Sequence, residues 1–158
     1  MRLGARRLRR FNARTANDAL SPEGSMQIKS AKDLIVYQKA YQLAMAIFEL
    51  SKKFPPAEVY ALTGQIRRSS RSVCLNLREA WAKRRYEAHF VSKLTDCDGE
   101  NSETDSSLDF AKDCGYITRE QHEKLITLCR EIGKMLGAMI KNPHPFLTPD
   151  LRPPTSDP

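Results

Sequence analysis

Four arginines recur along one stretch of the sequence at spacings that would align them on one side of an α-helix. They are Arg67, Arg71, Arg78 and Arg85, and at roughly 100° per residue they fall within about 40° of one another. Arginine carries a planar, permanently charged guanidinium group whose donors match the oxygens of phosphates and carboxylates. The spacing therefore predicts a cationic helix face that would bind a polyanion or an acidic protein surface. The alternative is a solvated face that only keeps the protein soluble.

Neighbouring basic residues extend this candidate nucleic-acid site. Contacts of this kind would be directed at the phosphate backbone of RNA or DNA and would weaken steeply with salt. Tyr86 and Trp81 could add base stacking, although core packing is the better explanation of Trp81. The full set of candidate contacts is Arg67, Arg68, Arg71, Arg78, Lys83, Arg84 and Arg85.

An opposing explanation is that these cations pair with acidic residues of the following helix, within one chain or between chains. That segment carries seven carboxylates: Asp96, Asp98, Glu100, Glu103, Asp105, Asp109 and Asp113. In that case the charges would set the register between subunits and not the choice of ligand.

The elements that position these side chains are predicted to be helices, because apolar residues recur with helical spacing through four segments. We expect helices at about 31–53, 57–85 and 87–113. A fourth opens with the capping box Thr118-x-x-Gln121 and ends near Lys141. No β-strand pattern is present. Four helices with short connections predict an all-α, antiparallel up-down-up-down four-helix bundle over residues 30–141.

The first predicted helix carries two adjacent apolar stripes, which is more than one seam of a bundle requires. A second buried side indicates either a central position in the bundle or a subunit interface. We predict an oligomer interface that includes one of these stripes, Val36, Ala40, Leu43 and Ile47.

Composition places most of the excess charge outside the predicted bundle. The chain has 158 residues, 41% of them hydrophobic, and a net charge of +7. Residues 1–25 hold six arginines and two acidic residues, which leaves twenty basic and seventeen acidic residues in the remainder. We predict a disordered basic arm over residues 1–29 and a disordered proline-rich tail over residues 142–158. The arm has two further interpretations: an organelle transit peptide, or a segment upstream of a natural start at Met26.

Several functional classes are disfavoured by the sequence. No apolar run approaches the roughly 20 residues that cross a bilayer, and no secretory signal follows the first arginines, so we expect a cytoplasmic protein. The calcium-loop and di-iron spacings do not fit, and neither a phosphate loop nor a nucleophile–base pair is present. The four cysteines lie far apart without metal-ligand spacing. We therefore expect no enzymatic activity, no metal and no cofactor.

From Met26 to Ile140 the sequence resembles the bacterial 23S rRNA intervening-sequence proteins. The match is carried by KDLIVYQKAYQLA (Lys32–Ala44), KFPPAEVYALTGQIRRSSRSV (Lys53–Val73), NLREA (Asn76–Ala80), RRYEAHFVSKL (Arg84–Leu94) and FAKDCGYIT (Phe110–Thr118). The resemblance implies a four-helix bundle that assembles into a ring, usually a homopentamer, without known catalysis. The related accessory proteins of diversity-generating retroelements imply RNA or a reverse transcriptase as partners. Cys74 and Ala80 stand where that family often has proline and glycine, which predicts a straighter second helix.

Two polar residues inside the NLREA segment have simple structural explanations. Asn76 borders the apolar stripe, and a buried amide there would fix the register between helices. Glu79 lies one turn before Lys83, so an i,i+4 ion pair would account for it. A functional role is the alternative for both. The sequence thus predicts a non-catalytic oligomeric bundle that binds RNA or DNA, with a protein assembly scaffold as the second hypothesis.

Overall fold

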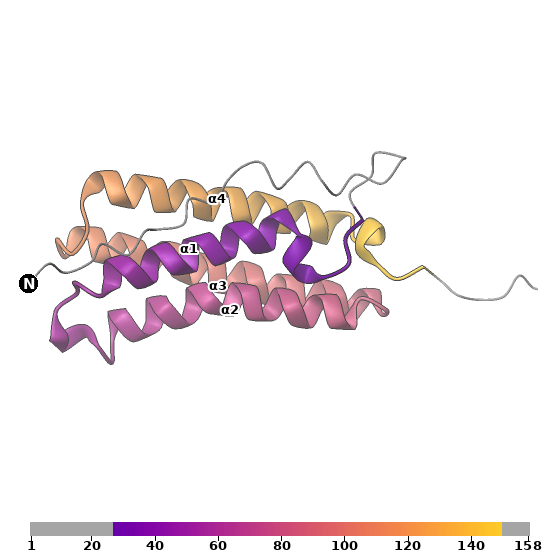
Figure 1. Cartoon of the computed structure of the whole chain (residues 1–158), viewed down its shortest axis with the longest axis horizontal. Helices are drawn as coiled ribbons and strands as arrows, with labels where there is room; N and C mark the ends of the chain where they lie inside the picture. Colours follow the sequence, from indigo (N-terminus) through magenta and orange to yellow (C-terminus); the bar gives the residue numbers. More distant parts are fainter. Residues whose placement is uncertain (1–26, 150–158) are drawn as a thin grey trace, which may run out of the picture.

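The computed structural model describes residues 27–149 and is all-α over that range (Figure 1). Four helices pack side by side: α1 (Ile35–Ser51), α2 (Leu62–Lys83), α3 (Glu87–Asp113) and α4 (Arg119–Lys141). Three short 3₁₀ helices flank them: η1 (Ala31–Asp33), η2 (Pro56–Glu58) and η3 (His144–Phe146). In Figure 1 the α1–α2 and α3–α4 connections lie at one end and the α2–α3 turn lies at the other. The predicted arm falls almost wholly outside the described residues.

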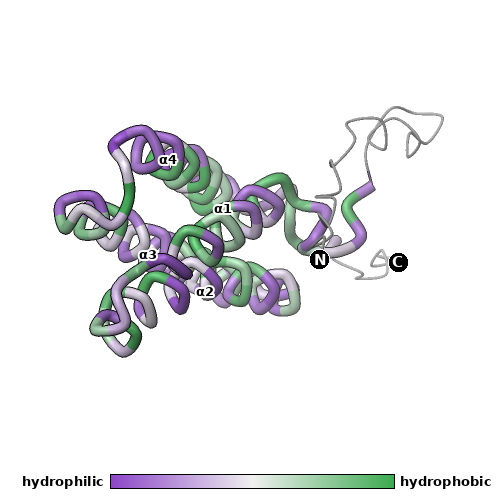
Figure 2. Tube along the Cα trace, turned by 60° about the vertical axis from the view of Figure 1, so that its left-hand side comes forward, coloured by the Kyte–Doolittle hydropathy of each residue, from purple (hydrophilic) through white to green (hydrophobic). Residues whose placement is uncertain are grey.

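The hydrophobic core runs along the centre of the four helices. Large side chains that are almost completely buried come from every helix, among them Leu43, Ile66, Phe90 and Leu136. Figure 2 shows hydrophobic positions gathered where the helices face one another and hydrophilic positions along the outside. Removal of this apolar surface from water is the main source of stability.

The structure contradicts the predicted oligomer interface on α1. Its four residues, Val36, Ala40, Leu43 and Ile47, are at most 3% exposed within the single chain. They face the protein's own core, because this side of α1 packs against both α2 and α4. The outer part of α1 is instead aromatic: Tyr41 is 55% exposed, and Tyr37 and Phe48 are half-buried.

The boundaries of α1 and α2 differ from the predicted ones, and their starts are set by capping and proline residues. Ser30 caps η1 through a reciprocal capping box with Asp33, and the extended backbone of Leu34 separates η1 from α1. Pro55 and Pro56 lead into η2, so α2 begins at Leu62 instead of near residue 57. The same helix ends at Lys83. Helices α3 and α4 occupy the expected segments.

The start of the proline-rich tail packs against the bundle, in contrast to the predicted disorder from residue 142. Pro143 is buried, and η3 places the ring of Phe146 at 6.3 Å from the ring of Phe90. Leu147 also packs against the core. Residues 150–158 lie outside the described range.

The predicted capping box at the start of α4 is present and provides a stability test. The Thr118 hydroxyl accepts a hydrogen bond from the backbone N–H of Gln121, whose side chain accepts one in return. We expect Thr118→Ala to lower the free energy of unfolding by about 1 kcal/mol, measured by urea denaturation. Thr127→Ala is the matched control, because the exposed Thr127 hydroxyl only bonds back to Glu123 within α4. Equal losses in both variants would contradict a specific role for the cap.

Candidate nucleic-acid interface

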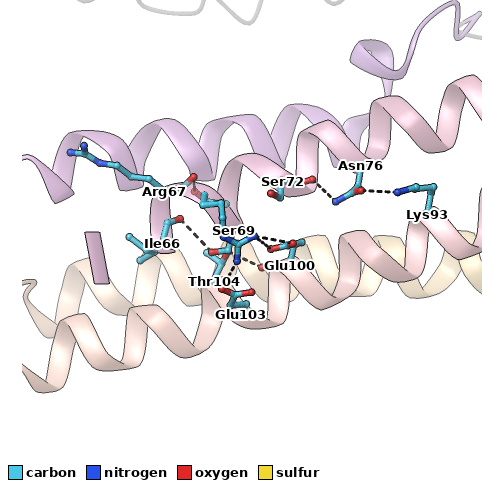
Figure 3. A network of polar contacts seen from close by, with 11 residues as sticks. Ile66, Arg67, Ser69, Ser72, Asn76, Lys93, Glu100, Glu103 and Thr104 are labelled. Carbon is cyan, nitrogen blue, oxygen red and sulfur yellow. Dashed lines mark hydrogen bonds and ion pairs between the residues drawn. The ribbon is translucent and has the colours of Figure 1, made fainter. Parts of the chain in front are cut away.

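The face formed by α1 and α2 carries alternating aromatic and cationic side chains. Phe48 of α1 lies beneath two guanidinium groups of α2: that of Arg67 is 5.1 Å and that of Arg71 is 5.7 Å from the ring centroid. Arg67 also donates from Nε to the Ser51 hydroxyl at 2.7 Å. Figure 3 shows Arg67 extending away from the contacts between α2 and α3. These two arginines are therefore held against α1 by cation–π contacts.

The same face continues toward the beginning of α1. Arg78 donates from Nη1 to the hydroxyl of Ser30 at 3.0 Å. The rings of Tyr37 and Tyr41 stack with centroids 6.4 Å apart and planes inclined by 16°. Burial raises the pKa of the Tyr37 phenol, and the positive charge of Arg78 acts in the opposite direction. We call this surface the α1–α2 face, defined by Tyr37, Tyr41, Phe48, Arg67, Arg71 and Arg78.

Arg68 differs from its neighbours because it turns toward α3. It forms ion pairs with Glu100 at 3.2 Å and with Glu103 at 2.5 Å, and these hydrogen bonds raise the pKa of the guanidinium group. Pairing with the acidic helix therefore explains Arg68. Within residues 27–149, none of the other six candidate cations forms an ion pair with a carboxylate.

The remaining candidate cations gather at the α2–α3 turn and do not continue the ladder. Because α2 ends at Lys83, Arg85 lies beyond the helix and is not its fourth rung. The Arg84 guanidinium packs on the ring of Trp81 at 4.0 Å and donates to the Trp81 carbonyl oxygen at 2.7 Å. Tyr86 is 60% exposed, with the Arg85 guanidinium 6.0 Å from its ring. The seven predicted residues thus lie in three separate places: on the α1–α2 face, in ion pairs with α3, and at the α2–α3 turn.

A polar network joins α2 to α3 on the side away from Arg67 (Figure 3). The buried hydroxyls of Ser69 and Thr104 are hydrogen-bonded at 2.9 Å. Asn76 donates to the Ser72 carbonyl oxygen at 3.0 Å and accepts from Lys93 at 3.5 Å. The amide of Asn76 therefore connects the two helices.

Glu79 belongs to the same network and not to the predicted i,i+4 pair. Its ion pair is with Lys93 of α3 at 2.9 Å, and Lys93 also reaches Asp96 at 3.2 Å. Contact with Lys93 lowers the pKa of Glu79, and contact with Glu79 raises the pKa of Lys93. The structure thus accounts for Glu79 and Asn76 as residues that join α2 to α3.

Two hollows lie elsewhere on the described part of the molecule. An apolar cleft of about 440 Å³ lies between the beginning of α1 and the end of α4, lined by residues including Ile28, Ile35, Met135 and Phe146. A smaller hollow of about 320 Å³ lies between α3 and α4. No cluster of three or more histidine, cysteine or acidic side chains suited to a metal occurs among residues 27–149. None of the described helices is both long enough and apolar enough to cross a membrane.

The aromatic half of the α1–α2 face was not predicted from the sequence. Tyr37, Tyr41 and Phe48 occur at helical spacing, and that spacing alone indicates burial. The sequence feature that indicates this face is the presence of two apolar stripes on α1, because only one of them can be fully buried in the core. The outer stripe is the one that meets the arginines of α2.

The chain is similar to a known protein family and to a solved structure. The family model described as 23S rRNA-intervening sequence protein matches residues 32–138. A crystal structure of a protein of unknown function from the S23 ribosomal protein family of Bacteroides thetaiotaomicron is 34% identical, with a TM-score of 0.63. The alignment covers 70% of this chain and 99% of that one. No curated protein matches the chain.

The pair between Glu79 and Lys93 predicts a pH-dependent contribution to stability. Because the pKa of Glu79 is lowered in the folded protein, the pair stabilises the fold at neutral pH, and this contribution is lost as the pH falls through the folded pKa, below the ordinary value of 4.5. We expect Glu79→Gln to lower Tm at neutral pH and to leave it unchanged under acidic conditions. Glu120→Gln is the control, since Glu120 and its partner Lys124 are both highly exposed. A Tm difference that persists in acid would contradict the assignment.

Proposed function

The chain belongs to the family of 23S rRNA-intervening sequence proteins, and we propose that it is a non-catalytic protein that binds nucleic acid, with RNA the leading ligand, through its α1–α2 face. The observation that carries this proposal is the contrast within α2. Arg68 is neutralised by two carboxylates of α3, whereas Arg67 and Arg71 lie beside the Phe48 ring of α1 and Arg78 lies beside the Ser30 hydroxyl that caps η1. Their positive charge is therefore available to an external anion.

The arrangement of the three arginines suits an extended polyanion. Arg78 lies eleven residues after Arg67 along α2, which is about 16 Å at 1.5 Å per residue. Cation–π contacts with Phe48 restrict Arg67 and Arg71 before any ligand binds, so less side-chain entropy is lost on binding. Contacts of this kind are made to phosphates, so the expected binding is salt-sensitive and weakly dependent on sequence.

The basic group at the α2–α3 turn supplements this face in the proposal. Lys83 and Arg85 are exposed, and Tyr86 stands beside them. If subunits assemble into a ring, each weak patch is repeated around it, and the combined affinity exceeds that of one subunit. Such a ring of up-down-up-down bundles, a pentamer as the family resemblance implies, is part of the proposal.

The α1–α2 face is tested by removing two of its charges. We expect Arg71→Gln/Arg78→Gln to weaken RNA binding and to lower the slope of log affinity against log salt by about 2 per bound subunit. Arg67 is retained because it also holds the buried Ser51 hydroxyl. The measurement is fluorescence anisotropy of a labelled RNA across a salt series.

The matched control is Arg119→Gln/Arg130→Gln, which removes the same charge from exposed positions of α4. Equal losses in the two double variants would show a general charge effect and contradict a defined face. A further variant replaces the six arginines of residues 1–25 by glutamine. If binding is lost in this variant and in no other, residues 1–25 bind the ligand and the α1–α2 face does not, which contradicts the proposal.

A protein assembly scaffold, for example an accessory factor of a reverse transcriptase, is the second candidate function. It is favoured by exposed apolar side chains beside the arginines: Leu75 of α2 is 63% exposed and Met45 of α1 is 43% exposed. If they form a subunit or partner interface, Leu75→Asp will lower the native mass measured by light scattering, whereas Leu75→Met will not. A partner captured from extract that stays bound after nuclease treatment supports the scaffold. A native mass unchanged in Leu75→Asp contradicts assembly through this face.

A further inference from the structure

We propose that the α1–α2 face takes a single strand of nucleic acid, with an unpaired base stacked on Tyr41 and the flanking phosphates bound by Arg71 and Arg78. This inference rests on the proposed function and makes its ligand more specific. Its basis is an exposed aromatic ring on α1 between two cationic contacts. Arg71 packs on Phe48 further along that helix, and Arg78 reaches Ser30 just before it. Neither arginine forms an ion pair within the described range of the chain.

Tyr41 provides the stacking surface. It is 55% exposed, and its ring is nearly parallel to that of Tyr37 at a centroid distance of 6.4 Å. The half-buried Tyr37 ring supports Tyr41 from one side. A large, rigid aromatic surface that is already ordered loses little entropy when a base packs on it.

The charges on both sides of Tyr41 suit a strand that runs along α1. Phe48 lies seven residues after Tyr41, about two helical turns away, and carries the guanidinium groups of Arg67 and Arg71. Tyr37 lies one turn before Tyr41, and the charge of Arg78 acts on its hydroxyl. Positive charge therefore flanks the tyrosine pair in both directions along the helix.

Among the described residues, the nearby carboxylates form no ion pair with the arginines of this face. Asp33 is engaged with the backbone N–H groups of Lys29 and Ser30, and Glu49 pairs with Lys52. Lys52 itself lies 4.7 Å from the Phe48 ring, but Glu49 balances its charge, so Arg67 and Arg71 are the cations available at that end. The face thus alternates an aromatic ring with cations, as expected for a single-strand surface.

A duplex would use only part of this surface. Its bases are stacked inside the helix, so it would contact the arginines through phosphates and leave Tyr41 without a partner. A single strand can turn a base outward onto the ring. Preference for single strands over duplexes is therefore the property that separates this inference from general phosphate binding.

The experiment compares labelled polyuridine, oligodeoxythymidine of the same length and an RNA duplex, using the full chain and fluorescence anisotropy. We expect polyuridine to bind more tightly than the duplex. Tyr41→Leu should weaken polyuridine binding by about tenfold and leave duplex binding unchanged. Tyr41→Phe keeps the ring and should bind like the original chain. Equal losses with polyuridine and oligodeoxythymidine assign the site to single strands of either sugar, and a loss confined to polyuridine assigns it to RNA; both support the inference.

Other outcomes overturn the inference and are distinguishable from failure of the proposed function. If Tyr41→Leu leaves polyuridine binding intact while Arg71→Gln/Arg78→Gln still weakens it, the phosphate face stands and the stacking site is wrong. If Tyr41→Leu weakens duplex binding equally, or changes the native mass, Tyr41 acts in structure or assembly and the inference is again overturned. If no nucleic acid binds the original chain, both the function and the inference fail.

Discussion

The rotation of α2 about its own axis is the constraint on which the rest of the surface depends, and a buried polar contact with α3 fixes it. Ser69 and Thr104 share a hydrogen bond in the core, and both are essentially inaccessible to solvent. A slipped register would remove this hydrogen bond between the helices, at a cost of about 0.5–1.5 kcal/mol. With Ser69 turned to α3, the neighbouring Arg68 reaches the acids of that helix. Arg67 then lies on the opposite edge, against α1.

A buried polar contact also fixes the position of α3 on the side that faces α4. Asn101 is buried and donates from Nδ2 to the carbonyl oxygen of Cys129 on α4 at 2.9 Å. The Oδ1 atom of the same amide has no hydrogen-bond partner in the part of the chain that the structure describes, so the Nδ2 bond alone restricts how α3 and α4 can slide past one another. Together with Ser69–Thr104, it places specific polar contacts on both sides of α3. The poor amphipathic pattern of this helix follows from the polar residues within its buried stripe, Asn101, Thr104 and Ser107.

Local signals in the sequence were sufficient for some elements and not for others. The capping box at Thr118 and Gly115, which adopts a positive φ of 78°, mark the end of α3 and the start of α4, and both helices were predicted correctly. The start of α2 was not, because residues after Pro55 and Pro56 form a 3₁₀ turn first. Periodicity also could not say which stripe of α1 faces the core, since Val36 and Tyr37 belong to stripes of similar apolar content. Only packing against both α2 and α4 decides that question.

Residue type alone was not enough to locate the candidate site. Seven cations were predicted as one surface, yet Arg68 is neutralised across the α2–α3 boundary and Arg84 packs on Trp81. A guanidinium group held between two carboxylates offers little net charge to a ligand. A guanidinium group over an aromatic ring keeps its full charge and its outward donors, because the ring contributes only a quadrupole. Arg71 and Arg68 are three residues apart on one helix and differ in this respect. Their neighbours on α1 and α3, which are distant in sequence, make that difference and therefore define the site.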